Sequence, residues 1–366
     1  MSEFLPLLSV IPAYIGPGAG FAFAGTLVVV LATFVLALST MLLWPFTYAW
    51  KRLRVGNPFK RAKFKRIIVF GIDGMDPVLA QRYIQEGHLP HFKKLAEQGV
   101  FRPLDTSHPS MSPVAWSTFS TGVDASGHGI YDFLTRDPCT YQPMLSSTDI
   151  KNAKKVLNIG KYIVPLEKPK IKLLQKSQTF WKILGDHHIF SSIQRVPITF
   201  PPVPFRGVLL SGMCVPDLRG SQGTFSFFST ATDDGHAAFT GGEQTVLRRK
   251  GNRIRSRIVG PDNGMRKDGR RMTIPFTLDI HPNAQKITLT LDNHKDSIEL
   301  KPRTLSPWVS LEFKAGLGIT VKGIARFYLM SMDTDISLYM TPIHIDPENP
   351  AMPISHPAVY SVYLAK

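Results

Sequence analysis

The longest apolar run constrains this chain more than any other feature. Residues 21–44 form 24 nearly continuous apolar positions without a charged side chain. A helix of that length extends about 36 Å, more than the ~30 Å hydrocarbon core of a bilayer. Aromatic side chains, which favour the membrane interface, follow at Trp44, Tyr48 and Trp50. We therefore predict one transmembrane helix over residues 21–48.

Two other interpretations of this run fit less well. A buried core helix is normally shorter and less uniform. A cleaved signal peptide has an apolar core of ~7–15 residues preceded by basic residues, whereas here the basic residues follow the run. Residues 1–20 then form a separate N-terminal segment.

A basic linker is predicted over residues 49–66. Its charged residues are all basic: Lys51, Arg52, Arg54, Lys60, Arg61, Lys63, Lys65 and Arg66. Basic residues beside a span stay on the cytoplasmic side, which predicts a single-pass cell-membrane protein with a cytoplasmic catalytic domain. The cluster is expected to contact anionic headgroups at about 1 kcal/mol per residue, although a solvated linker fits equally.

The net charge of +16 does not indicate nucleic-acid binding, because half of it comes from this linker. The linker also has too few aromatic residues to stack bases. The two cysteines, Cys139 and Cys214, form no CxxC motif. Such sparse cysteine favours reduced thiols over a disulfide or a cysteine zinc site, and a single disulfide remains the alternative.

A second informative stretch is the apolar run of residues 67–72, which ends on Asp73-Gly74. A short β-branched and aromatic run closed by Asp-Gly predicts a buried strand. Chemistry in open α/β sheets collects at the carboxyl ends of strands, where Asp73 would lie. Gly74 would allow the tight turn that follows.

A hydroxyl residue precedes a predicted helix about forty residues later. A helix beginning near Pro113 would place Ser112 at its N-cap, where free N–H groups and the helix dipole suit a phosphate. Ser112 could instead only cap the helix, and Ser110 is the second choice of nucleophile. Thr121 and Gly122 are expected to end the helix. A strand-end carboxylate and this hydroxyl together suggest a metal-assisted nucleophile.

Four motifs in this order carry a family resemblance. They are Ile72-Asp73-Gly74, Ser112-Pro113-Val114-Ala115-Trp116, Ser120-Thr121-Gly122 and His128-Gly129-Ile130. They resemble the type I phosphodiesterase/nucleotide pyrophosphatase branch of the alkaline phosphatase superfamily, strongly over residues 65–133 and more loosely over residues 181–230. The resemblance implies an α/β fold with an alkaline-phosphatase-like central sheet flanked by helices. It also implies that Asp73 binds a metal, usually zinc, and that Ser112 is the nucleophile and touches that metal.

The resemblance implies two zinc ions and further ligands later in the chain. The family takes these from an Asp followed four residues on by His, an Asp-His pair and a final His, and this sequence shows no convincing counterpart. His344-Ile345-Asp346 resembles a ligand pair by spacing only, and Asp186-His187-His188 comes too early and is interpreted as a loop. Two ligands cannot close a four-coordinate zinc site. We therefore expect the sequence to represent the amino-terminal half of a longer enzyme, inactive or very weak alone.

Three further polar residues lie outside this predicted ligand set. His128 lies between glycines and is interpreted as a hydrogen-bonded structural histidine rather than a ligand. Asp132 falls where related pyrophosphatases carry a substrate-binding Asn, so a phosphate contact there is not expected. Arg219 could hold a phosphate oxygen, but a surface arginine is the preferred interpretation.

The remaining chain divides by its patterns. Residues 67–230 are predicted as the α/β core, with a two-piece helix over 77–98, a short strand at 100–104, a helix at 179–184 and a strand at 189–193. A basic segment at residues 151–176 is interpreted as a surface connection or lid. Period-two runs predict a β-sandwich-like insertion over residues 231–345. These runs are residues 272–278, 286–291, 296–300, 309–313 and 319–322. Residues 346–366 return to the α/β core and begin a helical pattern at Pro357.

The leading functional prediction is a membrane-anchored, zinc-dependent phosphodiesterase or nucleotide pyrophosphatase. Its partners would be a phosphoester or nucleotide substrate and membrane lipids, with no nucleic acid. A membrane phosphotransferase acting on lipid or glycan headgroups and a non-catalytic membrane-tethered binding protein remain the alternatives.

Overall fold

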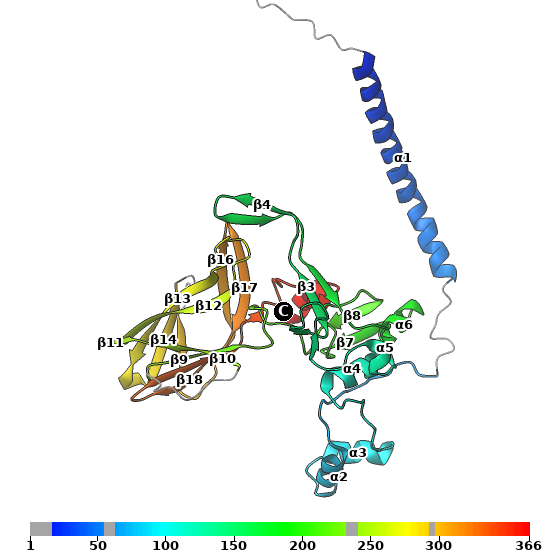
Figure 1. Ribbon diagram of the computed structural model, residues 1–366. Coiled ribbons are helices and arrows are strands. Elements are labelled where there is room, and N and C mark those ends of the chain that lie inside the picture. The colour runs from blue at the N-terminus through cyan, green and yellow to red at the C-terminus, as the bar shows by residue number, and fades with distance from the viewer. Residues whose placement is uncertain (1–16, 55–62, 232–240, 293–296) are drawn as a thin grey trace, which may run out of the picture. The chain divides into compact units, whose positions relative to one another are not determined.

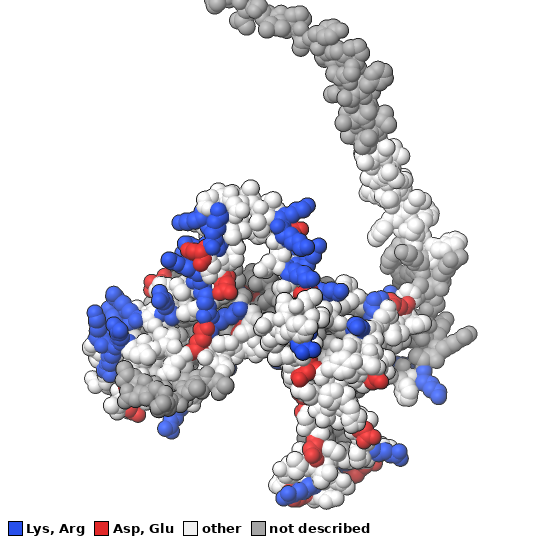
Figure 2. Space-filling view, viewed as in Figure 1, with Lys and Arg blue, Asp and Glu red and all other residues white. Residues whose placement is uncertain are grey.

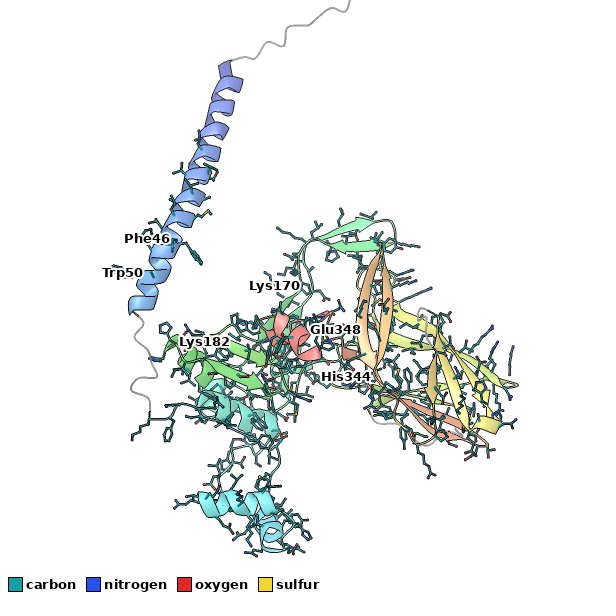
Figure 3. The ribbon with its side chains drawn as sticks, turned by 180° about the vertical axis from the view of Figure 1, so that it is seen from behind. Phe46, Trp50, Lys170, Lys182, His344 and Glu348 are labelled. Atoms are coloured by element: carbon teal, nitrogen blue, oxygen red, sulfur yellow. The ribbon has the colours of Figure 1, made fainter. Side chains whose placement is uncertain are left out.

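The computed structural model describes residues 17–54, 63–231, 241–292 and 297–366 (Figure 1). The chain divides into two compact units, Met1–Val69 and Phe70–Lys366. The first unit contains the 38-residue helix α1 (Pro17–Arg54). Figure 3 shows the side chains of Phe46 and Trp50 projecting from this helix, and both are well exposed.

A helix therefore occupies the position predicted for the membrane span, residues 21–48. Within the described part of the chain, no helix is long and apolar enough to cross a membrane. The side chains of residues 17–30 are not among those described. Most of the predicted segment 1–20 and part of the basic linker, residues 55–62, lie outside the described residues.

Two strands predicted near the start of the α/β region are wrong. Residues 67–72 and 100–104 belong to no described strand, and Ile68, Phe70 and Leu104 are 81%, 83% and 92% exposed. A strand requires a partner whose backbone groups pair with its own. Apolar β-forming residues supply the propensity but not that partner, so both segments remain outside any described strand and most of their residues are exposed.

The helices of this region are confirmed. The two-piece helix over residues 77–98 is α2 (Pro77–Gln85) and α3 (Pro90–Gln98). The Asp76 carboxylate caps α2 by accepting the N–H groups of Val78 and Leu79 at 2.8 and 2.9 Å. Helix α4 (Ser112–Thr121) ends at Gly122, as predicted, and α5 (Ala125–His128) follows. Gly122 has φ +70°, which L side chains disfavour.

Three two-stranded ribbons follow α5. They are β1 (Leu134–Arg136) with β2 (Pro143–Leu145), β3 (Thr148–Lys151) with β6 (Lys170–Leu173), and β4 (Val156–Ile159) with β5 (Tyr162–Pro165). The β4–β5 hairpin lies between β3 and β6 in the sequence. The basic segment predicted as a surface connection is thus built from paired strands.

A small mixed sheet forms the α/β centre. Helix α6 (Phe180–Asp186) leads into β7 (Ser191–Gln194), which pairs in parallel with β8 (Gly207–Leu210), and β21 (Ser355–His356) adds to β8 in antiparallel fashion. Helix α7 (Val359–Ala365) then ends the chain. The helix predicted at 179–184, the strand at 189–193 and the final helical pattern are confirmed. Trp181, Ile193 and Leu209 form the small core here.

Antiparallel strands dominate the region between β8 and β21. They are β9 (Phe225–Ser229), β10 (Gly242–Val246), β11 (Arg249–Lys250), β12 (Arg253–Asp262), β13 (Arg271–His281), β14 (Lys286–Leu291), β15 (Ile298–Leu300), β16 (Val309–Gly316), β17 (Ile319–Ala325), β18 (Phe327–Met332), β19 (Ile336–Met340) and β20 (His344–Ile345). They order as β10-β9-β19-β18, β11-β12-β13-β14-β15 and β16-β17-β20, with β9–β10 the parallel exception. All five strands predicted between residues 272 and 322 are confirmed.

These sheets share the largest hydrophobic core among the described residues. Along β13 and β14 every second side chain is buried, which is the pattern of strands with one covered face. Phe228 of β9 meets Phe276 of β13 edge to face, with ring centroids 5.3 Å apart. A Cβ on Gly260 of β12 would lie 2.3 Å from the Phe313 ring of β16, so only glycine fits there. The overall architecture is mixed α/β with several small sheets.

Candidate active site

Asp73 lies in a tight turn between residues 67–72 and helix α2. Gly74 has φ +66°, a conformation that glycine adopts without strain. The prediction that Gly74 allows a tight turn is therefore confirmed. Asp76 caps α2 on the far side of the turn. The turn leaves the Asp73 carboxylate exposed.

Ser112 is the first residue of α4, and Met111 takes the N-cap position. The predicted N-cap position of Ser112 is therefore wrong by one residue. No side chain caps this helix, so the interpretation of Ser112 as a mere cap is also wrong. The Ser112 hydroxyl instead donates to the Asp73 carboxylate, with Oγ 3.1 Å from Oδ1 and 3.2 Å from Oδ2. The structure thus brings together the two residues singled out from the sequence.

Trp116 is a third member of this group; the sequence patterns placed it in a family motif but assigned it no role. Its indole Nε1–H donates to Asp73 Oδ1 at 3.1 Å. Residues four apart lie on one face of a helix, so Ser112 and Trp116 reach the same carboxylate from successive turns of α4. That spacing is the signal that could have identified Trp116.

The Trp116 ring needs space beside the chain that carries Asp73. A Cβ built on Gly71 would lie 2.4 Å from the ring, closer than real contacts allow. Trp116 also contacts Phe119 edge to face, with ring centroids 5.6 Å apart. Phe119 contacts Phe180 in the same way at 5.6 Å, and Phe180 contacts Trp181 at 5.0 Å. These rings connect α4 to α6, the helix that leads into β7.

His128 is confirmed as a hydrogen-bonded structural histidine. It is fully buried. Its Nδ1 accepts the Ile130 N–H at 3.1 Å, so the neutral ring carries its proton on Nε2, 3.1 Å from Thr118 Oγ1. Burial lowers the pKa of His128, and the Asp124 carboxylate opposes this only in part. The hydrogen bonds of His128 therefore fix the turn between α4 and α5.

The described residues include Asp73 and Ser112, the two positions to which the family resemblance assigns a metal. The described part of the chain contains no group of three or more His, Cys, Asp or Glu side chains arranged to hold a metal ion. Asp73 and Ser112 offer oxygen ligands only, fewer than the four positions of a closed zinc site. In the His344-Ile345-Asp346 segment, the Asp346 carboxylate accepts hydrogen bonds from the Glu348 N–H and from the Asn349 side-chain amide.

Asp186 is the last residue of α6, so the loop interpretation of Asp186-His187-His188 is wrong for Asp186 and confirmed for the two histidines. Asp186 pairs with Lys182 at 2.6 Å, and His188 Nδ1 lies 3.3 Å from the Arg206 guanidinium. Asp132 accepts the N–H of Phe133. None of these residues joins the Asp73 turn.

The interpretation of Arg219 as a surface residue is wrong. Its side chain is 4% exposed and pairs with Glu243 at 3.4 Å. It also donates to Ser226 Oγ at 2.9 Å and to the Val259 carbonyl. Arg219 therefore connects β9, β10 and β12, a role for which the proline-bearing sequence around it gave no signal.

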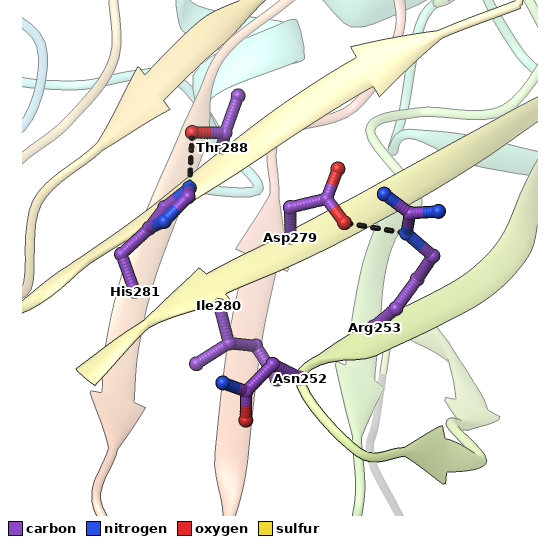
Figure 4. Close-up of a pocket in the computed structure, with 6 residues that line it drawn as sticks. All are labelled: Asn252, Arg253, Asp279, Ile280, His281 and Thr288. Atoms are coloured by element: carbon purple, nitrogen blue, oxygen red, sulfur yellow. Dashed lines mark hydrogen bonds and ion pairs between the residues drawn. The ribbon is translucent and has the colours of Figure 1, made fainter.

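Two hollows on the described surface are lined by residues far from Asp73 and Ser112 in the sequence. One, of about 610 Å³, is lined by β12, β13 and β14 (Figure 4). Its polar side chains bond to each other, Arg253 to Asp279 at 2.6 Å and His281 to Thr288 at 3.0 Å. A second, of about 290 Å³, is lined by residues that include Arg219, Glu243 and Arg271. Neither includes a residue of the Asp73 turn.

Comparison with known families agrees with this geometry. Residues 67–204 match the type I phosphodiesterase/nucleotide pyrophosphatase family. The matched range contains Asp73, Ser112, Trp116 and His128. The chain therefore carries a type I phosphodiesterase/nucleotide pyrophosphatase region over residues 67–204, and the predicted resemblance is confirmed for that part. No curated protein and no solved structure matches the chain.

Proposed function

We propose that the chain is a phosphoester hydrolase of the phosphodiesterase/nucleotide pyrophosphatase type, with Ser112 as the nucleophile. The observation that carries the proposal is the hydrogen bond from Ser112 Oγ to Asp73, within the region that matches the family. Ser112 lies at the N-terminus of α4, where the helix dipole favours an anionic phosphoryl group. Asp73 orients the hydroxyl, and Trp116 holds the carboxylate in place.

The reaction divides into two displacements. Ser112 Oγ attacks phosphorus, a phosphoserine ester forms, and the bond to the leaving alkoxide or phosphate breaks. The hydroxyl proton passes to the Asp73 carboxylate, which already accepts it as a hydrogen bond. Water then attacks phosphorus, the bond from phosphorus to Ser112 Oγ breaks, and the proton held by Asp73 returns to Oγ. The family is typically metal-dependent, and a metal, zinc by the family resemblance, would stabilise charge on the phosphoryl oxygens. Because Asp73 and Ser112 alone do not complete a zinc site, we expect slow turnover by this chain.

The test is hydrolysis of bis-p-nitrophenyl phosphate by the purified chain, with and without added zinc and with a chelator. Ser112→Ala is expected to reduce the rate to that of buffer, whereas Ser110→Ala, two residues away, is expected to retain it. Equal rates for Ser112→Ala and the unmodified chain would reject the nucleophile assignment. Turnover that is unchanged by the chelator would reject metal dependence. Substrate binding without any turnover would favour the non-catalytic alternative.

We also propose that α1 anchors the chain in the cell membrane, with the hydrolase region in the cytoplasm. Support comes from the uncharged run of residues 21–44 and from exposed apolar side chains on α1, such as Phe34 and Leu36, each 63% exposed. The basic linker favours the cytoplasmic orientation. Release of the chain from membranes by alkaline carbonate would reject the anchor. Digestion of the hydrolase region by protease added outside intact cells would reject the orientation.

Two finer features of the fold belong to the same proposal. The three-stranded sheet of β7, β8 and β21 would be part of an alkaline-phosphatase-like central sheet. Residues 231–345 would be a β-sandwich-like insertion into residues 67–230, with residues 346–366 returning to the α/β core. The pairing of β21 with β8 supports the return.

A further inference from the structure

The β4–β5 hairpin exposes apolar side chains on a narrow ribbon. Its strands pair with each other, with Ile159 opposite Tyr162 and Leu157 opposite Val164. Leu157 is 48% exposed and Ile159 is 52% exposed. A hairpin that faced only water would be expected to carry polar residues at such positions.

Contacts with the β-rich region hold this hairpin in place. The Ile163 N–H donates to the Met265 carbonyl at 2.9 Å, and the Lys267 N–H donates to the Lys161 carbonyl at 3.2 Å. The Tyr162 ring covers Gly316, where a Cβ would lie 2.7 Å from it. Because Gly316 ends β16, the hairpin lies beside the turn between β16 and β17.

That turn adds two more exposed apolar side chains. Leu317 follows Gly316 directly and is 56% exposed, and Ile319 begins β17 and is 48% exposed. Ile159 pairs with Tyr162, whose ring contacts Gly316. The four aliphatic residues therefore gather at one place, which we call the hairpin tip: Leu157, Ile159, Leu317 and Ile319.

Lysines surround the hairpin tip without acidic partners. They are Lys154, Lys155, Lys161, Lys267 and Lys314, all exposed. In the described part of the chain, none of them forms an ion pair within 4.0 Å, whereas Asp268 is taken by Arg266 at 2.6 Å. Glu167 instead accepts the backbone N–H groups of Lys154 and Lys155. Figure 2 shows uncharged atoms at the apex where Figure 1 places β4, with Lys and Arg on both sides.

We infer that the hairpin tip binds an anionic membrane surface. Aliphatic side chains at an apex enter the boundary between headgroups and acyl chains, and lysines around them pair with anionic headgroups. Both parts of this chemistry occur here within one small area. A nucleic acid fits less well, because the one aromatic ring at the hairpin, Tyr162, is packed against Gly316 and Lys161. The inference depends on neither α1 nor hydrolysis.

The test reports on the hairpin tip itself, because α1 could bind vesicles independently. The exposed Cys139 is replaced by Ser, and Ile159→Cys is labelled with an environment-sensitive fluorophore in the full chain. Met330→Cys is the matched control, since Met330 is 47% exposed but lies near Asp333 and Asp335. Vesicles of phosphatidylcholine, with or without about 30% phosphatidylserine, are then added.

With phosphatidylserine present, the label at position 159 is expected to brighten several-fold and shift to the blue, and the label at position 330 is not. Replacing Lys154, Lys155 and Lys161 by Gln should abolish this response, because each lysine contributes about a five-fold change in affinity. An unchanged label at position 159, or equal responses at both positions, would overturn the inference. Brightening with protein concentration in the absence of lipid would also overturn it, in favour of self-association.

Discussion

At the scale of single residues, the candidate site depends on a glycine that no catalytic motif includes. Gly71 leaves room for the Trp116 ring, which in turn donates to Asp73. Gly71→Ala places a methyl group 2.4 Å from that ring and is expected to destabilise the fold by about 1–3 kcal/mol, as overpacked cores do. Urea unfolding followed by fluorescence measures this loss.

A double-mutant cycle separates the steric clash from a general effect of alanine. Trp116→Phe removes the outer atoms of the indole ring, so the cost of Gly71→Ala should fall in that background. Gly264→Ala is the matched control, because no atom lies within 4 Å of the place its methyl group would occupy and its expected effect is within about 0.5 kcal/mol. Additive effects of Gly71→Ala and Trp116→Phe would show that the ring does not depend on Gly71.

The buried His128 predicts a pH dependence of stability. Burial lowers its pKa in the folded state below the ordinary value of 6.5. Below about pH 6.5 the imidazole of His128 binds a proton in the unfolded chain but not in the folded chain. The free energy of unfolding therefore falls as the pH drops through the folded pKa. The slope is at most about 1.4 kcal/mol per pH unit. His128→Gln should flatten this part of the profile of unfolding free energy against pH, and the exposed His91→Gln should leave it unchanged.

At the scale of elements, Arg219 joins three strands through one buried guanidinium. It bonds to Ser226 of β9, Glu243 of β10 and Val259 of β12. Arg219→Met removes the donor to Ser226 and Val259, whereas Glu243 keeps its pair with Arg271 at 2.7 Å. The change is expected to cost about 3 kcal/mol, the low end for a broken buried pair, because Glu243 is also 39% exposed. Thermal unfolding of the purified chain measures the loss.

Arg253→Met is the matched control for Arg219. Arg253 also pairs with a carboxylate, Asp279 at 2.6 Å, but its side chain is 57% exposed. Exposed pairs contribute below about 1 kcal/mol, so this change should be nearly silent. Equal losses for the two variants would mean that Arg219 acts as an ordinary surface residue.

Elements whose signals are local were predictable from the sequence. The alternation of apolar and polar residues in β13 and β14 predicts which face of each strand is buried. The end of α4 at Gly122 follows from the left-handed backbone conformation that glycine adopts easily. Residues 67–72 show the limit of such signals, because strand formation depends on a neighbour that composition does not describe. The approach of Ser112 to Asp73 was predicted from the family motif and from a strand end that does not form. The motif also contained Trp116, but its hydrogen bond to Asp73 required knowing where α4 begins.

At the scale of the whole molecule, apolar burial is uneven along the chain. The β-rich region holds one large core, in which residues such as Phe276, Phe313 and Leu338 are almost completely buried. The α/β region holds two clusters of three buried residues each. Segments with few buried contacts open at lower free energy than the core of a fold. The candidate site therefore lies in the part of the second unit with the lower expected local stability.

This difference predicts the order in which the chain opens. In hydrogen exchange under native conditions, amides of α2 and α3 should exchange first, because α3 has no buried residue and α2 has only Ala80. Amides of β13 and β14 should exchange last, since their free energy of opening approaches that of global unfolding. Low concentrations of urea should accelerate amide exchange in α4 before they affect β13. Phe276→Ala removes about 3–5 kcal/mol of core packing, so it should accelerate amide exchange in β13 without changing exchange in α2. Simultaneous exchange of α2 and β13 would instead mean that the small α/β clusters unfold only together with the large core.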